Sequence, residues 1–158
     1  NIDIVATREA GGEPVADLRV RSAVLRGIEI PPDLVPLAID EFPALFVAAA
    51  CAEGQTVLTG AGELRVKESD RIGVMAEGLK TLGIDAHPTP DGMVIRGGML
   101  SGGTVESHGD HRIAMAFAMA ALRSSQRITI NDCANVNTSF PGFVDLSRAA
   151  GLLVQNIR

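Results

Sequence analysis

A run of seven residues, 65–71 (RVKESDR), carries five charged side chains between two apolar stretches. If the run opens a helix, Lys67 and Arg71 lie on one face, with Glu68 one turn before Arg71. The unpaired N–H groups and the dipole at a helix N-terminus attract anions. The spacing therefore predicts two cations and a carboxylate around a phosphate or carboxylate ligand. The alternative is a solvated first turn whose acidic residues complement the dipole.

The composition narrows the kinds of molecule that such a site can serve. A chain of 158 residues with 46% hydrophobic and 21% charged residues is typical of one globular domain, or of part of a larger one. A formal charge of −5 and an aromatic content of 3% argue against nucleic-acid binding, which uses basic surfaces and stacking rings. Cys51 and Cys133 lie in apolar surroundings, which indicates reduced residues in or near the core of a cytoplasmic protein. We found no membrane-length apolar run and no signal peptide, so no membrane contact is predicted.

Two stretches of the chain, about 70 residues apart, repeat one order of elements. Ala-rich segments predict the first helix of each copy, and Gly83 and Gly151 predict where the second helices end. The predicted order is helix, strand, helix, strand, at 42–53, 56–59, 68–82 and 84–87 in the first copy and at 112–123, 127–131, 142–150 and 152–154 in the second. A hairpin that turns at 90–92 joins the copies, and a similar hairpin that turns at Gly11 and Gly12 opens the chain.

The position of the opening hairpin bears on the domain organisation. Because Asn1 falls directly before its first strand, we expect the chain to start in the middle of a repeat, with another unit upstream. The predicted organisation is a partial unit at about 1–35, followed by repeat units at about 36–100 and 101–158. Together these units are expected to form part of a larger fold.

The first helix of each copy is apolar nearly all round. Residues 44–52 and 113–122 offer no polar face, which predicts helices buried on all sides and wrapped by sheet. Charged residues precede both helices, and we expect them to converge at one mouth of the domain: Asp40, Glu41, Asp110, His111 and Arg112.

Four short motifs follow one another along the chain: 39–43 (IDEFP), 65–71 (RVKESDR), 109–115 (GDHRIAM) and 138–141 (TSFP). In this order and spacing they resemble the carboxy-terminal part of the EPSP synthase (3-phosphoshikimate 1-carboxyvinyltransferase) family. The resemblance implies an α+β fold of two domains built from repeated βαβαββ units, with helices inside and sheets outside. This is the inside-out α/β barrel of the enolpyruvyl transferase type, here truncated at its N-terminus, and the predicted repeat agrees with it.

The resemblance also implies a reaction and a role for five residues. The enolpyruvyl group of phosphoenolpyruvate would move to the 5-hydroxyl of shikimate 3-phosphate with release of phosphate, a step of aromatic amino acid biosynthesis by the shikimate pathway. Asp40 matches the family's catalytic aspartate, which also contacts the shikimate phosphate, and Glu68 matches its proton-donating glutamate. Lys67 matches the lysine for the shikimate phosphate, while Arg71 and Arg112 match arginines that grip phosphoenolpyruvate. No cofactor and no metal are implied.

Two positions depart from the pattern of many members. Glu63 stands where many carry an asparagine that contacts the shikimate moiety, so this contact is not carried over. Thr138 stands where many carry a lysine, as in the subgroup similar to glyphosate-tolerant bacterial enzymes, and the lysine's anion contact is not carried over either. His111, between two charged residues, is expected to orient its neighbours.

Several other interpretations of the same residues remain open. Asp40 could be an N-cap and Arg112 a surface ion-pair partner. A relative acting on a UDP-sugar, similar to UDP-N-acetylglucosamine enolpyruvyl transferase, is the second candidate. Residues 60–65 imitate a dinucleotide-binding turn of a nicotinamide-dependent oxidoreductase, although Arg65 replaces its third glycine. Residues 108–111 could belong to a metal-dependent hydrolase, but the run lacks a third, separated ligand.

The expected partner is the rest of the same enzyme. In the family the site lies between two domains, and the amino-terminal domain supplies most shikimate contacts. The chain alone is therefore predicted to fold, to bind phosphoenolpyruvate and shikimate 3-phosphate weakly, and not to turn over.

Overall fold

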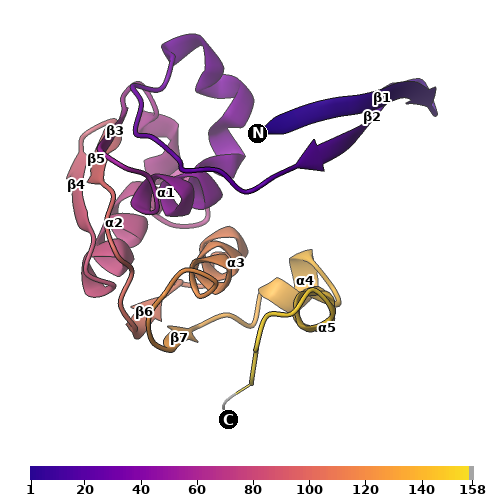
Figure 1. Ribbon diagram of the computed structural model, residues 1–158. Helices are drawn as coiled ribbons and strands as arrows, with labels where there is room; N and C mark the ends of the chain where they lie inside the picture. The colour runs from indigo at the N-terminus through magenta and orange to yellow at the C-terminus, as the bar shows by residue number, and fades with distance from the viewer. Residues whose placement is uncertain (157–158) are drawn as a thin grey trace.

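The computed structural model describes residues 1–156 as a mixed arrangement of helices and short sheets (Figure 1). The strands are β1 Ile2–Ala10, β2 Glu13–Val20, β3 Gln55–Leu58, β4 Asp85–Thr89, β5 Gly92–Arg96, β6 Gly103–Glu106 and β7 Ile128–Asn131. The α-helices are α1 Phe42–Ala50, α2 Arg71–Thr81, α3 His111–Ala120, α4 Val136–Ser139 and α5 Phe143–Ala149. The 3-10 helices are η1 Pro32–Leu34, η2 Pro36–Glu41 and η3 Gly62–Val66. None of the helices in the described range is long and apolar enough to cross a membrane.

The first predicted copy forms a three-stranded antiparallel sheet in the order β3-β5-β4. The hairpin predicted to turn at 90–92 is confirmed, with β4 and β5 paired on either side of it. Gly92 lies so close to β3 that a Cβ atom there would meet the Leu58 carbonyl oxygen at 1.9 Å. Only glycine fits this register, which seats the β4–β5 turn beside the loop that follows β3.

The repeated order of elements appears as two similar crossover arrangements. β6 pairs in parallel with β7, and α3 lies between them in the chain. In the same way Arg26 and Glu29 bridge in parallel to Glu53 and Val57, with α1 lying between the two segments in the chain. Each arrangement places the N-terminus of its helix at one end of the molecule, which is the condition for the predicted convergence of charges.

The core lies between the facing sides of α1, α2 and α3 and one face of the β3-β5-β4 sheet. Its largest apolar side chains are fully buried: Phe42, Phe46, Leu79, Ile95 and Phe117. A Cβ atom on Gly78 would meet the Phe117 ring at 2.2 Å, so α2 and α3 approach closely there. The prediction that the helices are buried on all sides is wrong for the described residues, because Leu45 on α1 is 41% exposed and Met119 on α3 is 37% exposed.

Several predicted boundaries need correction. The helix predicted at 68–82 begins at Arg71, because the side chain of Asp70 caps α2 by accepting the Gly73 N–H at 2.9 Å. Strand β6 and helix α4 were not predicted at all. The strand predicted after Gly151 is not formed: residues 152–154 join no ladder in the described chain, and a strand without a partner is not stable in water.

The opening hairpin is confirmed, with β1 and β2 antiparallel around Gly11 and Gly12. It projects from the other elements (Figure 1), and almost every residue in it is exposed.

Both cysteines are free thiols. Cys51 is half-buried, and burial raises the pKa of its thiol, whereas Cys133 is exposed, which corrects its predicted place in or near the core.

Candidate active site

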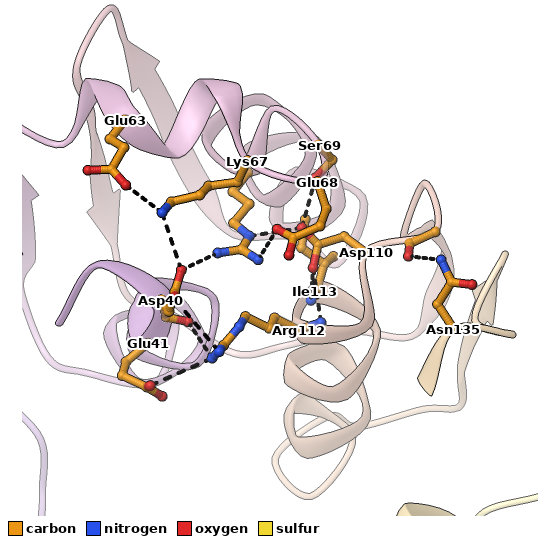
Figure 2. Close-up of polar contacts among 12 residues, drawn as sticks. Asp40, Glu41, Glu63, Lys67, Glu68, Ser69, Asp110, Arg112, Ile113 and Asn135 are labelled. Atoms are coloured by element: carbon orange, nitrogen blue, oxygen red, sulfur yellow. Dashed lines mark hydrogen bonds and ion pairs between the residues drawn. The ribbon is translucent and has the colours of Figure 1, made fainter. Parts of the chain in front are cut away.

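The charged ends of three elements meet in the structure, as predicted. Asp40 and Glu41 end η2, Lys67 follows η3, and Arg112 lies in the first turn of α3. Figure 2 shows these side chains pointing toward one another from separate elements. We call this cluster the charged mouth; its members are Asp40, Glu41, Lys67, Glu68, Arg71, Asp110 and Arg112.

The run at 65–71 does not form the helical turn predicted for it. Lys67 has an extended backbone, with φ −79° and ψ −154°, between the end of η3 and the start of α2. Lys67 and Arg71 therefore do not share one helical face, and Glu68 is a loop residue instead of a first-turn residue. The reason is the side chain of Asp70, which satisfies a free N–H of α2 and places the helix start at Arg71.

Arg71 is the centre of the charged mouth. Its side chain is fully buried, and each guanidinium nitrogen donates to a different carboxylate. Nε lies 2.8 Å from Asp110 Oδ2, Nη1 lies 2.9 Å from Asp40 Oδ1, and Nη2 lies 2.5 Å from Glu68 Oε2. Burial opposes the charged form most strongly, but the hydrogen bonds and negative charges of these carboxylates outweigh it and raise the pKa of Arg71.

Asp40 lies among three cations and is not a helix cap. The N-cap of α1 is Glu41, so the interpretation of Asp40 as a simple N-cap is wrong. Besides its bond to Arg71, Asp40 Oδ1 lies 3.6 Å from Lys67 Nζ, and Asp40 Oδ2 lies 3.8 Å from Arg112 Nη2. The Arg71 hydrogen bond, aided by the charges of Arg112 and Lys67 against partial burial, lowers the pKa of Asp40.

Lys67 and Arg112 are less completely enclosed than Arg71. Lys67 Nζ lies 2.5 Å from Glu63 Oε1, and this bond is the main reason that the pKa of Lys67 is raised. The Arg112 side chain is 34% exposed; its Nη1 donates to the Asp40 carbonyl oxygen at 3.1 Å and lies 3.6 Å from Glu41 Oε1. Both cations thus keep a solvent-facing side that an anionic ligand can reach.

Arg65 fastens the loop that carries Lys67 and Glu68. Its guanidinium donates to the Pro90 carbonyl at 2.7 Å and to the Thr89 carbonyl at 2.5 Å, and it pairs with Asp70 at 2.6 Å. The loop is therefore tied to the β4–β5 turn.

Residues 60–65 do not form the strand–turn–helix of a dinucleotide-binding site. Strand β3 is followed by the 3-10 helix η3, and the next α-helix, α2, begins only at Arg71.

A cavity of about 460 Å³ opens beside Glu68. Its lining residues, all but Gly109 of polar type, come from the loop before α2, from the loop before α3 with the first residue of that helix, and from α4 with its N-cap: Glu68, His108, Gly109, His111, Asn135, Thr138 and Ser139. Thr138 and His111, which the sequence analysis singled out, thus lie next to the predicted proton donor. Among the described residues, no group of three or more His, Cys, Asp or Glu side chains is placed to hold a metal ion.

Sequence reasoning did not assign a role to Asp110. The structure shows it fully buried at the N-cap of α3, in contact with Arg71. The available signal was an aspartate directly before an apolar helix, which predicts a cap but not a partner 39 residues away.

The structure is an α+β fold that gathers cations and carboxylates at one mouth, and comparisons with known proteins show that this is the fold of enolpyruvyl transferases and specify the family. A solved EPSP synthase from Acinetobacter baumannii superposes with a TM-score of 0.95 at 57% identity, covering 98% of this chain and 37% of that chain. Residues 4–146 match the family model described as EPSP synthase (3-phosphoshikimate 1-carboxyvinyltransferase). The chain therefore belongs to the EPSP synthase family, and the predicted α+β fold is confirmed.

Curated relatives agree with this assignment. A 3-phosphoshikimate 1-carboxyvinyltransferase of Methylococcus capsulatus is 70% identical over 155 residues, which cover 98% of this chain and 36% of the relative. One from Alkalilimnicola ehrlichii is 71% identical over 153 residues, covering 96% and 34%. The chain spans about a third of the length of the curated relatives it matches. That this third is the carboxy-terminal one stays a prediction.

Proposed function

We propose that this chain forms one part of the active site of a 3-phosphoshikimate 1-carboxyvinyltransferase. The enzyme would transfer the enolpyruvyl group of phosphoenolpyruvate to the 5-hydroxyl of shikimate 3-phosphate and release phosphate. The observation that carries the proposal is the charged mouth, in which Lys67, Arg71 and Arg112 surround Asp40. Both substrates are polyanions, and a cluster of cations beside two helix starts is suited to bind them.

The two reacting protons are assigned to two carboxylates. Asp40 would accept the proton of the 5-hydroxyl as its oxygen attacks C2 of phosphoenolpyruvate, and the cations Lys67 and Arg112 beside it favour its ionised, proton-accepting form. Glu68 would donate a proton to the methylene carbon, and the same carboxylate would take a proton back from the resulting methyl group as phosphate leaves. Over the two steps a new C–O bond forms, the C–O bond to phosphate breaks, Glu68 returns to its starting state, and Asp40 gives the hydroxyl proton to the departing phosphate.

The cations would hold the anionic groups while these protons move. Lys67 is proposed for the shikimate phosphate, and Arg71 and Arg112 for phosphoenolpyruvate. Without ligand, Nη1 and Nη2 of Arg71 are occupied by Asp40 and Glu68, whose side chains are 44% and 51% exposed. A substrate carboxylate or phosphate can replace these half-exposed groups, because they lose little by turning to solvent.

The remainder of the site would come from the part of the enzyme that this chain does not include. We propose that this part is the amino-terminal domain, that the organisation is a partial unit at about 1–35 followed by units at about 36–100 and 101–158, and that the chain alone does not turn over. We also propose a cytoplasmic enzyme, since free thiols such as Cys51 and Cys133 persist in a reducing compartment.

A chimeric enzyme tests the proposal. The segment of the Methylococcus capsulatus relative that matches this chain is replaced by this chain, and phosphate release is followed with both substrates. We expect steady turnover from the chimera and none when either substrate is omitted or replaced by UDP-N-acetylglucosamine. The unmodified relative is the positive control, and thermal unfolding shows that the chimera is folded. A folded chimera that releases no phosphate would overturn the proposal.

A further inference from the structure

Arg71 and Asp110 are the two fully buried charged side chains within residues 1–156. Burying a charge costs several kcal/mol unless it is paired and its hydrogen-bonding atoms are satisfied. Asp110 meets both conditions, and no buried polar side-chain atom in the described range lacks a partner. Each of the two charges therefore offsets the cost of burying the other.

The two oxygens of Asp110 bind different elements. Oδ1 accepts the backbone N–H groups of Arg112 at 3.0 Å and of Ile113 at 3.4 Å, and so caps α3. Oδ2 accepts Arg71 Nε at 2.8 Å and the Ser69 hydroxyl at 3.2 Å. One carboxylate thus joins the N-terminus of α3, which carries Arg112, to the N-terminus of α2, which begins with Arg71.

Asp110 binds Arg71 on the side that a ligand does not need. Asp40 and Glu68 occupy Nη1 and Nη2, and both are about half exposed. Asp110 occupies Nε and is fully buried. When an anion replaces the two exposed carboxylates, the buried one can stay, because the forked guanidinium offers its terminal nitrogens independently of Nε.

The backbone before Asp110 is anchored on both sides. The buried Ser107 hydroxyl lies 2.9 Å from the Asn131 carbonyl oxygen, and Asn135 Nδ2 donates to the Gly109 carbonyl at 2.6 Å. His108 has φ 51°, a left-handed backbone conformation that residues other than glycine rarely adopt. A strained residue held by neighbouring hydrogen bonds indicates a loop whose conformation is over-determined, which suits a positioning role.

We propose that Asp110 is a positioning residue that sets the distance and angle between Arg71 and Arg112. It acts on phosphoenolpyruvate binding through these two arginines and touches no substrate. This inference rests on the proposed function of the charged mouth.

Asp70 provides a matched control. It is also an aspartate N-cap, accepting the Gly73 N–H of α2 at 2.9 Å, and it also pairs with an arginine, Arg65, at 2.6 Å. Its side chain is 43% exposed, and its partner is not a member of the charged mouth. Asparagine caps helices as well as aspartate, so Asp70→Asn and Asp110→Asn both keep the cap and remove one charge.

The kinetic test compares these two variants in the chimeric enzyme. In Asp110→Asn the amide oxygen can still cap α3, but the NH2 group faces the Arg71 Nε–H, which loses its acceptor. We expect the KM for phosphoenolpyruvate to rise about tenfold, while the KM for shikimate 3-phosphate changes less than about threefold. Asp70→Asn should change either KM less than about threefold.

If Asp110→Asn does not fold, Asp110→Ser, which keeps a cap without a carboxylate, replaces it. An unchanged KM for phosphoenolpyruvate in a folded variant overturns the inference.

A second measurement needs neither substrate nor turnover. In the ¹⁵N-labelled 158-residue chain, the Arg71 Nε–H resonance, assigned by its loss in Arg71→Lys, should exchange slowly with solvent. Asp110→Asn should speed this exchange about tenfold or more, and Asp70→Asn should leave it unchanged. Fast exchange in the unmodified chain would overturn the inference without any variant. A chimera that fails to turn over while this protection is observed would reject the proposed function and leave the Asp110 pairing intact.

Discussion

The two arginines proposed to bind phosphoenolpyruvate are held in contrasting ways. Arg71, at the start of α2, is fully buried, and its guanidinium is used by three carboxylates. Arg112, at the start of α3, is one-third exposed and donates mainly to a backbone carbonyl oxygen. The difference shows that two arginines at neighbouring helix starts need not carry equal shares of stability and binding: the α2 side supplies a preorganised charge, and the α3 side supplies an accessible one.

The largest expected difference between the two arginines is in stability. Arg71→Ala leaves buried Asp110 without its main counter-charge and should lower the free energy of unfolding by about 3–5 kcal/mol. Arg112→Ala removes a partner that is one-third exposed and should cost at most about 1 kcal/mol. Urea unfolding of the 158-residue chain, followed by circular dichroism, measures both. Equal losses of unfolding free energy in the two variants would contradict the contrast between Arg71 and Arg112.

On the α2 side, a substitution at Glu68 should lower the catalytic rate without unfolding the protein. Glu68→Gln in the chimeric enzyme keeps a hydrogen-bonding group near Arg71 but cannot donate or accept the reacting proton. We expect kcat to fall by about 100-fold or more, since general acid catalysis contributes at least this much, while the fold persists. Phosphate release under saturating substrates is the measurement. Unchanged turnover would remove Glu68 from the proposed mechanism.

Asp40 contacts both arginines and makes the cluster sensitive to acid. Its folded-state pKa is lowered below the ordinary value of 3.8, so its contribution to stability is present above that value and is lost as pH falls toward the folded-state pKa. The unmodified chain should lose stability between about pH 5 and about pH 3, and Asp40→Asn should lose less. Urea midpoints at both pH values measure this. Parallel losses in the two proteins would count against the ion pairs of Asp40.

The smallest expected effect concerns Glu63, which competes with ligand for Lys67. Glu63→Gln removes the main cause of the raised pKa of Lys67 and frees the ammonium group for a phosphate. We expect the KM for shikimate 3-phosphate to fall about two- to threefold, because exposed ion pairs are weak. Initial rates of the chimera at varied shikimate 3-phosphate measure it. An increase in this KM would indicate that Glu63 itself supports substrate binding.

The convergence of charges could be predicted from the sequence because it follows from a repeated order of elements. Two apolar helices preceded by acidic and basic residues place those residues at one end, and the structure confirms this for Asp40 and Arg112. The hairpins were also predictable, since glycine pairs and Pro-Asp-Gly turns act locally.

The features that could not be predicted depend either on competing local hydrogen bonds or on contacts between residues far apart in the sequence. The local pattern allowed a helix from Glu68, but Asp70 has its own hydrogen bond to Gly73 and starts α2 later. The pairing of Asp110 with Arg71 depends on how α2 packs beside α3, which no local pattern contains. Strand β6 is a run of four residues that is defined only by its pairing with β7.

The most direct test of the central claim is phosphoenolpyruvate saturation of the chimeric enzyme with and without Arg112→Ala. The claim is that the charged mouth of this chain binds that substrate. It predicts phosphate release only when both substrates are present, and a KM for phosphoenolpyruvate that rises about tenfold or more in the variant, because a charge-assisted contact is lost while stability is nearly unchanged. A chimera with the same KM for phosphoenolpyruvate in both forms would contradict it.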